Sequence, residues 1–283
     1  MIYLSTGGFA EKTFLQTTKV FEPRIIKGFE LSAGKYTPSL DDDLKTVSER
    51  FSIALHNYFP VPEEPFVFNL ASFDADILRK SMEHAKKAIA LSGKYDCKFY
   101  SFHAGYLLDP EVTELGKKIQ AKKLNCRIEG LKQFVKNVNV LAEFASELNV
   151  TLLIENNVLS NANLKSFGCN PLLMTDPSET AHIFEQMPEN VKLLIDVAHL
   201  KVSANSLDFD PVKYLMDFRD ITSGYHISDN NGLEDSNEPF SRESWFIDHI
   251  RKDLTYYSLE IYVSDIEILE RQYTLLSDIL RCS

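Results

Sequence analysis

Cysteine is scarce in this sequence: four residues among 283, and they lie far apart in the chain. They are Cys97, Cys126, Cys169 and Cys282. No two of them form the Cys-x-x-Cys pair found in many zinc and redox sites, so a cysteine-based metal site is not expected. Scattered thiols of this kind indicate a protein that works in a reducing compartment.

The sequence also lacks a long hydrophobic run and an excess of basic residues. No stretch approaches the ~20 apolar residues that a membrane span requires, and the start, MIYLSTGGFAEK, lacks the basic segment of a signal peptide. The formal net charge of -11 argues against nucleic acid as the main partner. We therefore expect a cytoplasmic protein that binds neither membranes nor nucleic acid. Whether it forms a homo-oligomer is left open.

What the sequence does have is a regular alternation of short β-rich runs and longer amphipathic segments. This alternation predicts parallel strands joined by crossover helices. Eight such units in 283 residues predict an α/β fold, a single (β/α)8 TIM barrel domain over residues 1–283. An open doubly wound sheet is the alternative, but no Gly-x-Gly-x-x-Gly follows the first run. The expected strands are 1–5, 25–32, 66–71, 97–105, 150–157, 191–199, 224–230 and 256–263, and the expected helices are 41–59, 72–93, 128–149, 175–187, 208–218, 241–254 and 265–280.

Polar side chains end most of the expected strands, and in such barrels the carboxyl ends of the strands carry the chemistry. Four consecutive strands supply three carboxylates and an imidazole: Glu155, Asp196, His226 and Glu260. Burying several carboxylates together is costly unless a cation neutralises them or they share protons. Carboxylate oxygens with a neutral imidazole suit Mn²⁺, Mg²⁺, Co²⁺ or Zn²⁺, so we predict one divalent metal ion at this face. Further strand-end residues are Glu30, Asn69, His103 and, three residues after Asp196, His199.

Other candidate residues have simpler interpretations. His56, His84, His182 and His249 fall in helical patterns, where we expect surface or packing roles. The acidic stretch 227–238 is expected to be a solvated turn, in which Asp229 lies near enough to His226 to accept its hydrogen bond. Lys201 follows His199 closely enough to reach a substrate oxygen, and Tyr106 and Tyr262 lie just past strand ends, where they would stack on a substrate ring.

These strand ends resemble the xylose isomerase-like barrel superfamily, which holds sugar isomerases and epimerases, inosose dehydratases and endonuclease IV. The matching motifs are IENN with Glu155, DVAH with Asp196 and His199, HISD with His226 and LEIY with Glu260. The resemblance implies that Glu155, Asp196, His226 and Glu260 hold the metal, and that the two glutamates also act as acid and base. It implies a substrate contact for His199 in the epimerase branch and a metal contact in the nuclease branch. His103, in FHAG, resembles a histidine of the nuclease branch.

The segment after the seventh expected strand departs from that superfamily. It reads DSNEPFSRESW, where a His-x-Pro-x-Gly-x-Gly segment is often found. Asp235 aligns with a later aspartate of the nuclease branch, but Asn237 stands where a metal-binding histidine would be. The substrate-binding arginine of the epimerases is also absent from its position, and Arg242 is the candidate substitute.

The sequence thus predicts a divalent-metal-dependent sugar isomerase or epimerase that acts through an enediolate on a small carbohydrate. Acidic residues in the loops after the last two strands favour a neutral or amino-bearing polyol or ketose over a sugar phosphate. A metal-dependent cyclitol dehydratase, an endonuclease IV-like phosphodiesterase and a non-catalytic sugar-binding protein remain alternatives. The phosphodiesterase would need more histidine ligands and a basic surface.

Overall fold

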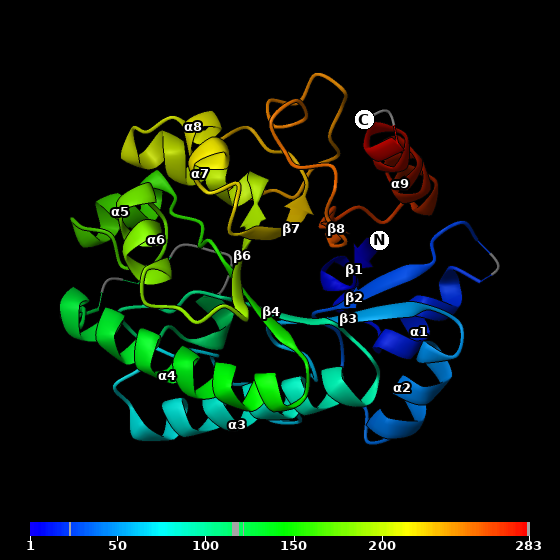
Figure 1. The fold of residues 1–283 in the computed structure, drawn as a ribbon, viewed down its shortest axis with the longest axis horizontal. Helices are drawn as coiled ribbons and strands as arrows, with labels where there is room; N and C mark the ends of the chain where they lie inside the picture. Colours follow the sequence, from blue (N-terminus) through cyan, green and yellow to red (C-terminus); the bar gives the residue numbers. More distant parts are fainter. Residues whose placement is uncertain (23, 115–118, 121, 282–283) are drawn as a thin grey trace.

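Eight parallel strands close into a barrel in the computed structural model, which describes every residue except 23, 115–118, 121, 282 and 283 (Figure 1). Each strand pairs with the next in chain order, and the last pairs with the first. The strands are β1 (Ile2–Ser5), β2 (Gly28–Leu31), β3 (Ser52–His56), β4 (Phe99–His103), β5 (Thr151–Glu155), β6 (Val191–Asp196), β7 (Thr222–Ile227) and β8 (Tyr257–Leu259). The predicted (β/α)8 TIM barrel is confirmed.

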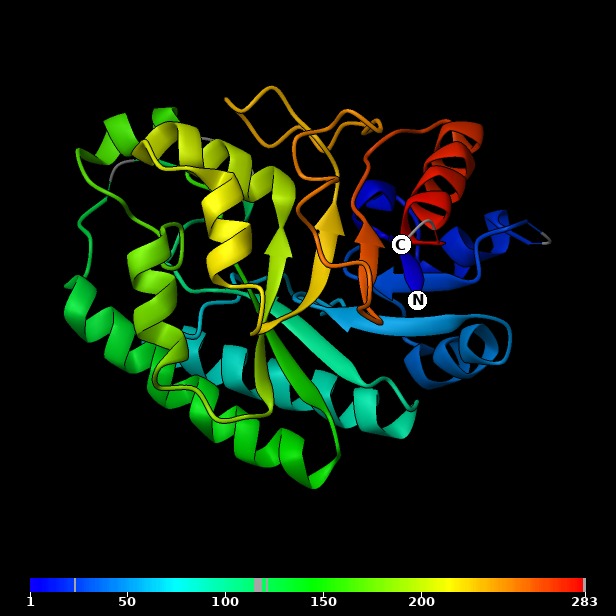
Figure 2. The same ribbon diagram turned by 45° about the horizontal axis from the view of Figure 1, so that its top comes forward.

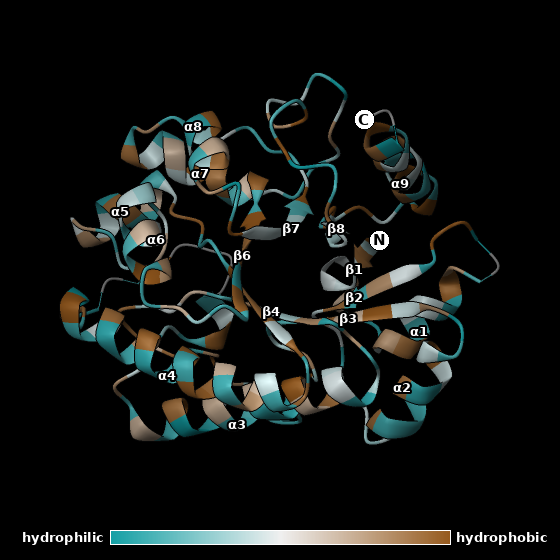
Figure 3. Ribbon diagram, viewed as in Figure 1, coloured by the Kyte–Doolittle hydropathy of each residue, from teal (hydrophilic) through white to brown (hydrophobic). Residues whose placement is uncertain are grey.

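Helices surround the barrel and bury their apolar faces against it. They are α1 (Phe14–Val20), α2 (Leu40–Ser48), α3 (Ala75–Lys94), α4 (Arg127–Glu147), α5 (Asn161–Phe167), α6 (Pro177–Phe184), α7 (Val197–Leu207), α8 (Pro211–Asp217) and α9 (Ile266–Arg281). Apolar and polar residues alternate along α3 and α4, as expected for helices with one buried face (Figure 3). Asp74, Asp176 and Asp210 cap the first turns of α3, α6 and α8 with their carboxylates. Within the described residues, none of the helices is long and apolar enough to cross a membrane.

The third strand lies elsewhere than predicted. Residues 66–71 form an extended loop, and the third strand is Ser52–His56, inside the segment expected to be one long helix. Helix α2 ends at Ser48, and β3 then continues the core with Ile53, Ala54 and Leu55, all buried. Asn69 therefore ends no strand. Its amide instead donates to Asp109 Oδ1 at 2.8 Å and to two backbone carbonyls of the loop after β4.

Two other segments also differ from the prediction. Strand β6 ends at Asp196 and α7 begins at Val197, so His199 lies in a helix rather than a strand. Residues 241–254 form successive turns rather than a helix, although Phe246, Ile247 and Ile250 are buried at the expected helical spacing. As a result, β7 and β8 are joined by an irregular crossover, residues 228–256, that contains no α-helix; all of these residues are described.

The barrel interior has an apolar floor and a polar mouth. Side chains two residues apart on a strand share a face, so Phe99, Ser101 and His103 of β4 all point inward at increasing height. The floor is a cluster of Ala54, Phe99, Leu153, Leu194 and Tyr256, with Tyr3 packed against it. Figure 2 shows β6, β7 and β8 pointing the same way, with the crossover after β7 beyond their arrowheads. Strand-end residues therefore meet at one mouth.

The three described cysteines, Cys97, Cys126 and Cys169, are free thiols. The fourth, Cys282, lies outside the described residues. Cys97 is buried, and the other two are exposed.

Candidate metal centre and cavity

The four predicted metal ligands lie together at the mouth of the barrel. Glu155, Asp196, His226 and Glu260 are all buried, and one potential ligand atom from each lies within 4.8 Å of those from the others. His226 Nδ1 is 3.3 Å from Glu155 Oε1, 3.5 Å from Glu260 Oε2 and 3.8 Å from Asp196 Oδ2. The strand register explains the grouping, because Asp196 on β6 lies directly beside His226 on β7.

The donor set fits a divalent cation. Both carboxylate oxygens of Glu155, Oδ2 of Asp196 and Nδ1 of His226 are buried, and none has a hydrogen-bond partner. Buried polar atoms without partners are costly, and several that converge on one point fit a cation between them. Burial raises the pKa of Asp196 to about 6 and that of Glu260 to about 8, and the neighbouring carboxylates add to both shifts. A bound cation would favour the charged form of each carboxylate.

Asp196 serves two purposes with its two oxygens. Oδ1 accepts a hydrogen bond from the backbone N–H of His199 at 2.8 Å and so caps α7. The other oxygen, Oδ2, faces the group described above. A strand that ends on this aspartate therefore starts the next helix and contributes to the mouth at the same time.

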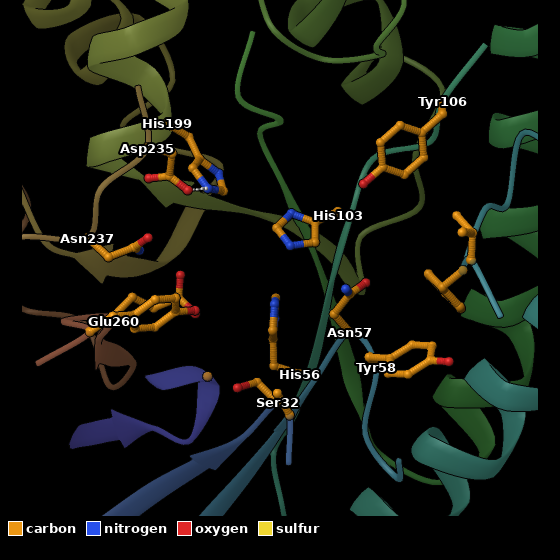
Figure 4. Close-up of a pocket in the computed structure, with 15 residues that line it drawn as sticks. Ser32, His56, Asn57, Tyr58, His103, Tyr106, His199, Asp235, Asn237 and Glu260 are labelled. Carbon is orange, nitrogen blue, oxygen red and sulfur yellow. Dashed lines mark hydrogen bonds and ion pairs between the residues drawn. The ribbon is translucent and has the colours of Figure 1, made fainter. Parts of the chain in front are cut away.

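His199 lies on the first turn of α7, beside the cavity. Its Nδ1 is 3.0 Å from the backbone oxygen of Asn156, and its Nε2 is 3.1 Å from Asp235 Oδ2 (Figure 4). Burial opposes protonation of His199, but Asp196 and Asp235 outweigh it and raise the pKa of His199 well above its usual value. The expectation of a fully solvated acidic turn at 227–238 is therefore wrong for Asp235, which lines the cavity.

Two further histidines extend the group. His56 and His103 lie with Glu155 as a second set that could hold a metal ion, each histidine 3.5 Å from Glu155 Oε2. His56 ends β3 and is 3% exposed, so its expected place on a helix is wrong. The signal in the sequence was the apolar run Ile53–Leu55 directly before it, which has the same pattern as the other strand ends.

Lys201 and Arg242 lie outside this arrangement. Lys201 Nζ donates to Asp229 Oδ1 at 2.7 Å and to the backbone oxygen of Asn230. Arg242 is exposed, and neither residue lines the cavity. The sequence predicted that Asp229 accepts a hydrogen bond from His226, and this is wrong. Asp229 accepts from Lys201 and Ser244 instead. The carboxylate that accepts from His226 Nε2 is that of Glu30, at 2.8 Å.

A cavity of about 440 Å³ opens above the carboxylates and histidines. Figure 4 shows His56 and His103 projecting toward its middle, between Glu260 and Asn237 on one side and Tyr58 and Tyr106 on the other. Tyr262 also lines it. None of the described residues that line it is a lysine or an arginine. Its lining residues are Gly7, Ser32, Ala33, His56, Asn57, Tyr58, Val67, Phe68, His103, Tyr106, His199, Asp235, Asn237, Glu260 and Tyr262.

The fold and the site together define a (β/α)8 barrel with a candidate metal centre at the carboxyl ends of its strands. The chain belongs to the xylose isomerase-like TIM barrel family, whose model matches residues 26–255. No curated protein matches the sequence.

Solved structures share the whole fold at low sequence identity. A D-tagatose 3-epimerase-like protein has a TM-score of 0.72 and 17% identity, over 99% of this chain and 97% of that one. D-psicose 3-epimerase from Clostridium cellulolyticum H10, solved with D-tagatose, has a TM-score of 0.67 and 13% identity, over 99% and 98%. The IOLI protein with a zinc atom has a TM-score of 0.68 and 13% identity, over 99% and 98%.

Proposed function

We propose that this protein is a divalent-metal-dependent isomerase or epimerase of a small, uncharged carbohydrate. The observation that carries the proposal is the buried set Glu155, Asp196, His226 and Glu260, of which Glu260 also lines the cavity. Structural neighbours described as sugar 3-epimerases support the same reaction class.

Glu155, Asp196, His226 and Glu260 would hold the metal, since their buried unpartnered atoms converge. Oxygen ligands with one imidazole suit Mn²⁺, Mg²⁺, Co²⁺ or Zn²⁺. The structure of the IOLI protein, which has a similar fold, is described with a zinc atom. When bound, the cation would supply positive charge that polarises a substrate carbonyl and acidifies the adjacent C–H.

The two glutamates are the proposed acid and base. They come from β5 and from the residue after β8, so they approach a substrate from different sides of the mouth. One carboxylate would remove the proton from the carbon beside the carbonyl, leaving an enediolate. In an epimerase, the other carboxylate would return a proton to the opposite face of that carbon. In an isomerase, the first carboxylate would return the proton to the neighbouring carbon.

The cavity favours a neutral substrate. The described lining residues offer amides, hydroxyls and imidazoles but no lysine or arginine, and Asp235 adds a carboxylate. A phosphate group would therefore find no lysine or arginine there, and Asp235 and Glu260 would repel it. His103 and His199 are proposed to contact substrate. Lys201 and Arg242 are left out of the proposal, because neither lines the cavity.

The test uses protein loaded in turn with each of the four cations and a panel of free ketoses, aldoses and their phosphate esters. We expect turnover of a free sugar, with incorporation of deuterium from D₂O at the reacting carbon, measured by NMR. Glu260→Gln should lower kcat by about 10²-fold or more, whereas Glu267→Gln, on the exposed first turn of α9, is the matched control. Full activity of Glu260→Gln, or a kcat/KM preference for the phosphate esters, would contradict the proposal.

A second candidate function is hydrolysis of a phosphodiester at more than one metal. It is favoured by the additional set His56, His103 and Glu155, which shares Glu155 with the first. The net charge of -11 and the absence of lysine and arginine from the described lining weigh against it. More than one bound metal per chain together with cleavage of a phosphodiester probe, without sugar turnover, would establish it. Loss of water from a cyclitol, or sugar binding without turnover, would mark the other two alternatives.

A further inference from the structure

A buried hydrogen-bond network next to the metal-binding residues links Glu30, Tyr256, Ser101 and His56. It centres on Glu30 of β2, which is fully buried. Glu30 Oε2 accepts from His226 Nε2 at 2.8 Å and also from the hydroxyl of Tyr256. Two donors thus converge on this one oxygen, which is the hydrogen-bond pattern of an ionised carboxylate. The carboxylate is therefore an acceptor only.

The chain continues from Tyr256 across the barrel to His56. Ser101 Oγ is 3.2 Å from the Tyr256 hydroxyl and 3.0 Å from His56 Nδ1. The proton direction follows link by link. The Tyr256 hydroxyl donates its only hydrogen to Glu30, so its oxygen must accept a hydrogen bond from Ser101. Ser101 thereby donates its only hydrogen to Tyr256, so it must accept from His56 Nδ1.

We propose that Glu30 is a positioning residue that sets the tautomers of two histidines, His226 directly and His56 through Tyr256 and Ser101. A neutral imidazole carries one proton. With its proton on Nδ1, the neutral ring of His56 presents its free Nε2 to Glu155. In His226, Glu30 holds the proton on Nε2, so Nδ1 is the nitrogen that faces Glu155 and would bind a cation. The two distances are 3.3 Å from His226 Nδ1 and 3.5 Å from His56 Nε2.

This arrangement prepares the mouth for a cation. The lone pair on Nε2 of the neutral His56 faces a carboxylate oxygen of Glu155, which is repulsive unless a positive charge lies between them, so the network favours a site that binds metal. It also links the candidate metal sets, because His226 belongs to the set with Asp196 and Glu260, His56 belongs to the set with His103, and both belong with Glu30 to a third set. The metal part of this inference rests on the proposed function, whereas the tautomer of His56 does not.

The first experiment measures the His56 tautomer in metal-free protein with ¹⁵N-labelled histidine and long-range ¹H–¹⁵N NMR. The His56 signals are assigned by their loss in His56→Gln. In the wild type we expect the proton on Nδ1. In Tyr256→Phe, Ser101 regains a free proton to donate to Nδ1, so the His56 proton should move to Nε2 and face Glu155. The control is Tyr257→Phe, whose hydroxyl contacts Arg251 O and Leu254 N instead.

A His56 proton that stays on Nδ1 in Tyr256→Phe, or lies on Nε2 in the wild type, overturns the proposal. A structural role alone would not move this proton while the fold, checked by circular dichroism, is unchanged.

The second experiment measures zinc affinity of the same proteins and of Glu30→Gln. Removing the carboxylate behind a metal-binding histidine typically weakens metal binding by about 10–100-fold, and we expect that loss in Glu30→Gln and none in Tyr257→Phe. Wild-type affinity in a folded Glu30→Gln would overturn the role of Glu30. If the wild type itself binds no zinc or other divalent cation, the proposed function fails. The measurement of the His56 tautomer still tests whether the hydrogen-bond network sets the position of that proton.

Discussion

Asp196 combines a helix cap and a proposed metal ligand in one side chain, and two substitutions separate these roles. Asparagine caps helices about as well as aspartate, whereas alanine loses the cap at a typical cost of ~1 kcal/mol. We therefore expect Asp196→Asn to keep the free energy of unfolding of the metal-free protein and to lose most metal affinity. Asp196→Ala should lose both. Denaturant unfolding and metal titration of the two variants check this.

The metal role of Asp196 would be refuted by metal binding in Asp196→Asn with the stoichiometry and affinity of the wild type. The capping role would be refuted if the alanine and asparagine variants had equal stability in the absence of metal.

His84 on α3 is buried among the rings of Tyr58, Phe66 and Phe68, with Nε2 3.2 Å from the backbone oxygen of Asn57. Burial lowers the pKa of His84 from 6.5 to about 4. Below pH 6.5 the unfolded chain takes up a proton that the folded protein refuses until about pH 4, so stability falls through this window as the pH falls. The full loss is on the order of 3 kcal/mol.

We expect His84→Phe to reduce this loss, because phenylalanine has no proton to bind. The check is the free energy of unfolding of both proteins at several pH values between 7 and 4. Parallel pH profiles of wild type and variant would show that His84 does not contribute.

At the scale of the elements, the sequence predicted strand ends well where a long apolar run precedes them. Glu155, Asp196 and His226 follow such runs, so their positions at the mouth follow from the strand pattern alone. Strand β3 was hidden because Leu44, Val47 and Phe51 keep a helical spacing up to its start, and only the end of α2 at Ser48 breaks the pattern. His56 was assigned to a helix as a consequence.

Other parts of the site depend on distances that a sequence pattern does not contain. Glu30 on β2 and Tyr256, the residue before β8, meet inside the barrel although β1 lies between the two strands and the residues are 226 positions apart in the chain. No local spacing links them, and their contact follows only from closure of the barrel. Likewise, the turns over 241–254 bury the same apolar residues that a helix would bury. The spacing of apolar residues in the sequence therefore does not distinguish a helix from a series of turns in this segment.

For the whole molecule, the metal centre ties together strands that are far apart in the chain, so metal binding should raise thermal stability. Binding only to the folded state at a metal concentration 100 times Kd stabilises by about 2.7 kcal/mol. For a chain of this size that corresponds to a Tm increase of several degrees. We expect treatment with a chelator to lower Tm and re-addition of the correct cation to restore it.

The matched control is Asp196→Asn, whose Tm should respond little to metal or chelator. A wild-type Tm that none of the four cations changes would contradict a metal centre that binds these four side chains in the folded state.

The irregular crossover between β7 and β8 has a consequence for how such a protein diversifies. It supplies Asp235 and Asn237 to the cavity, yet it contributes no helix to the outer layer. Substitutions at these two cavity-lining residues leave the outer helices in place, whereas the crossover's buried Phe246, Ile247 and Ile250 belong to the core. Ligand preference and fold integrity can therefore evolve at separate places in the chain. A mutational library confined to 229–244 is where altered selectivity should be sought first.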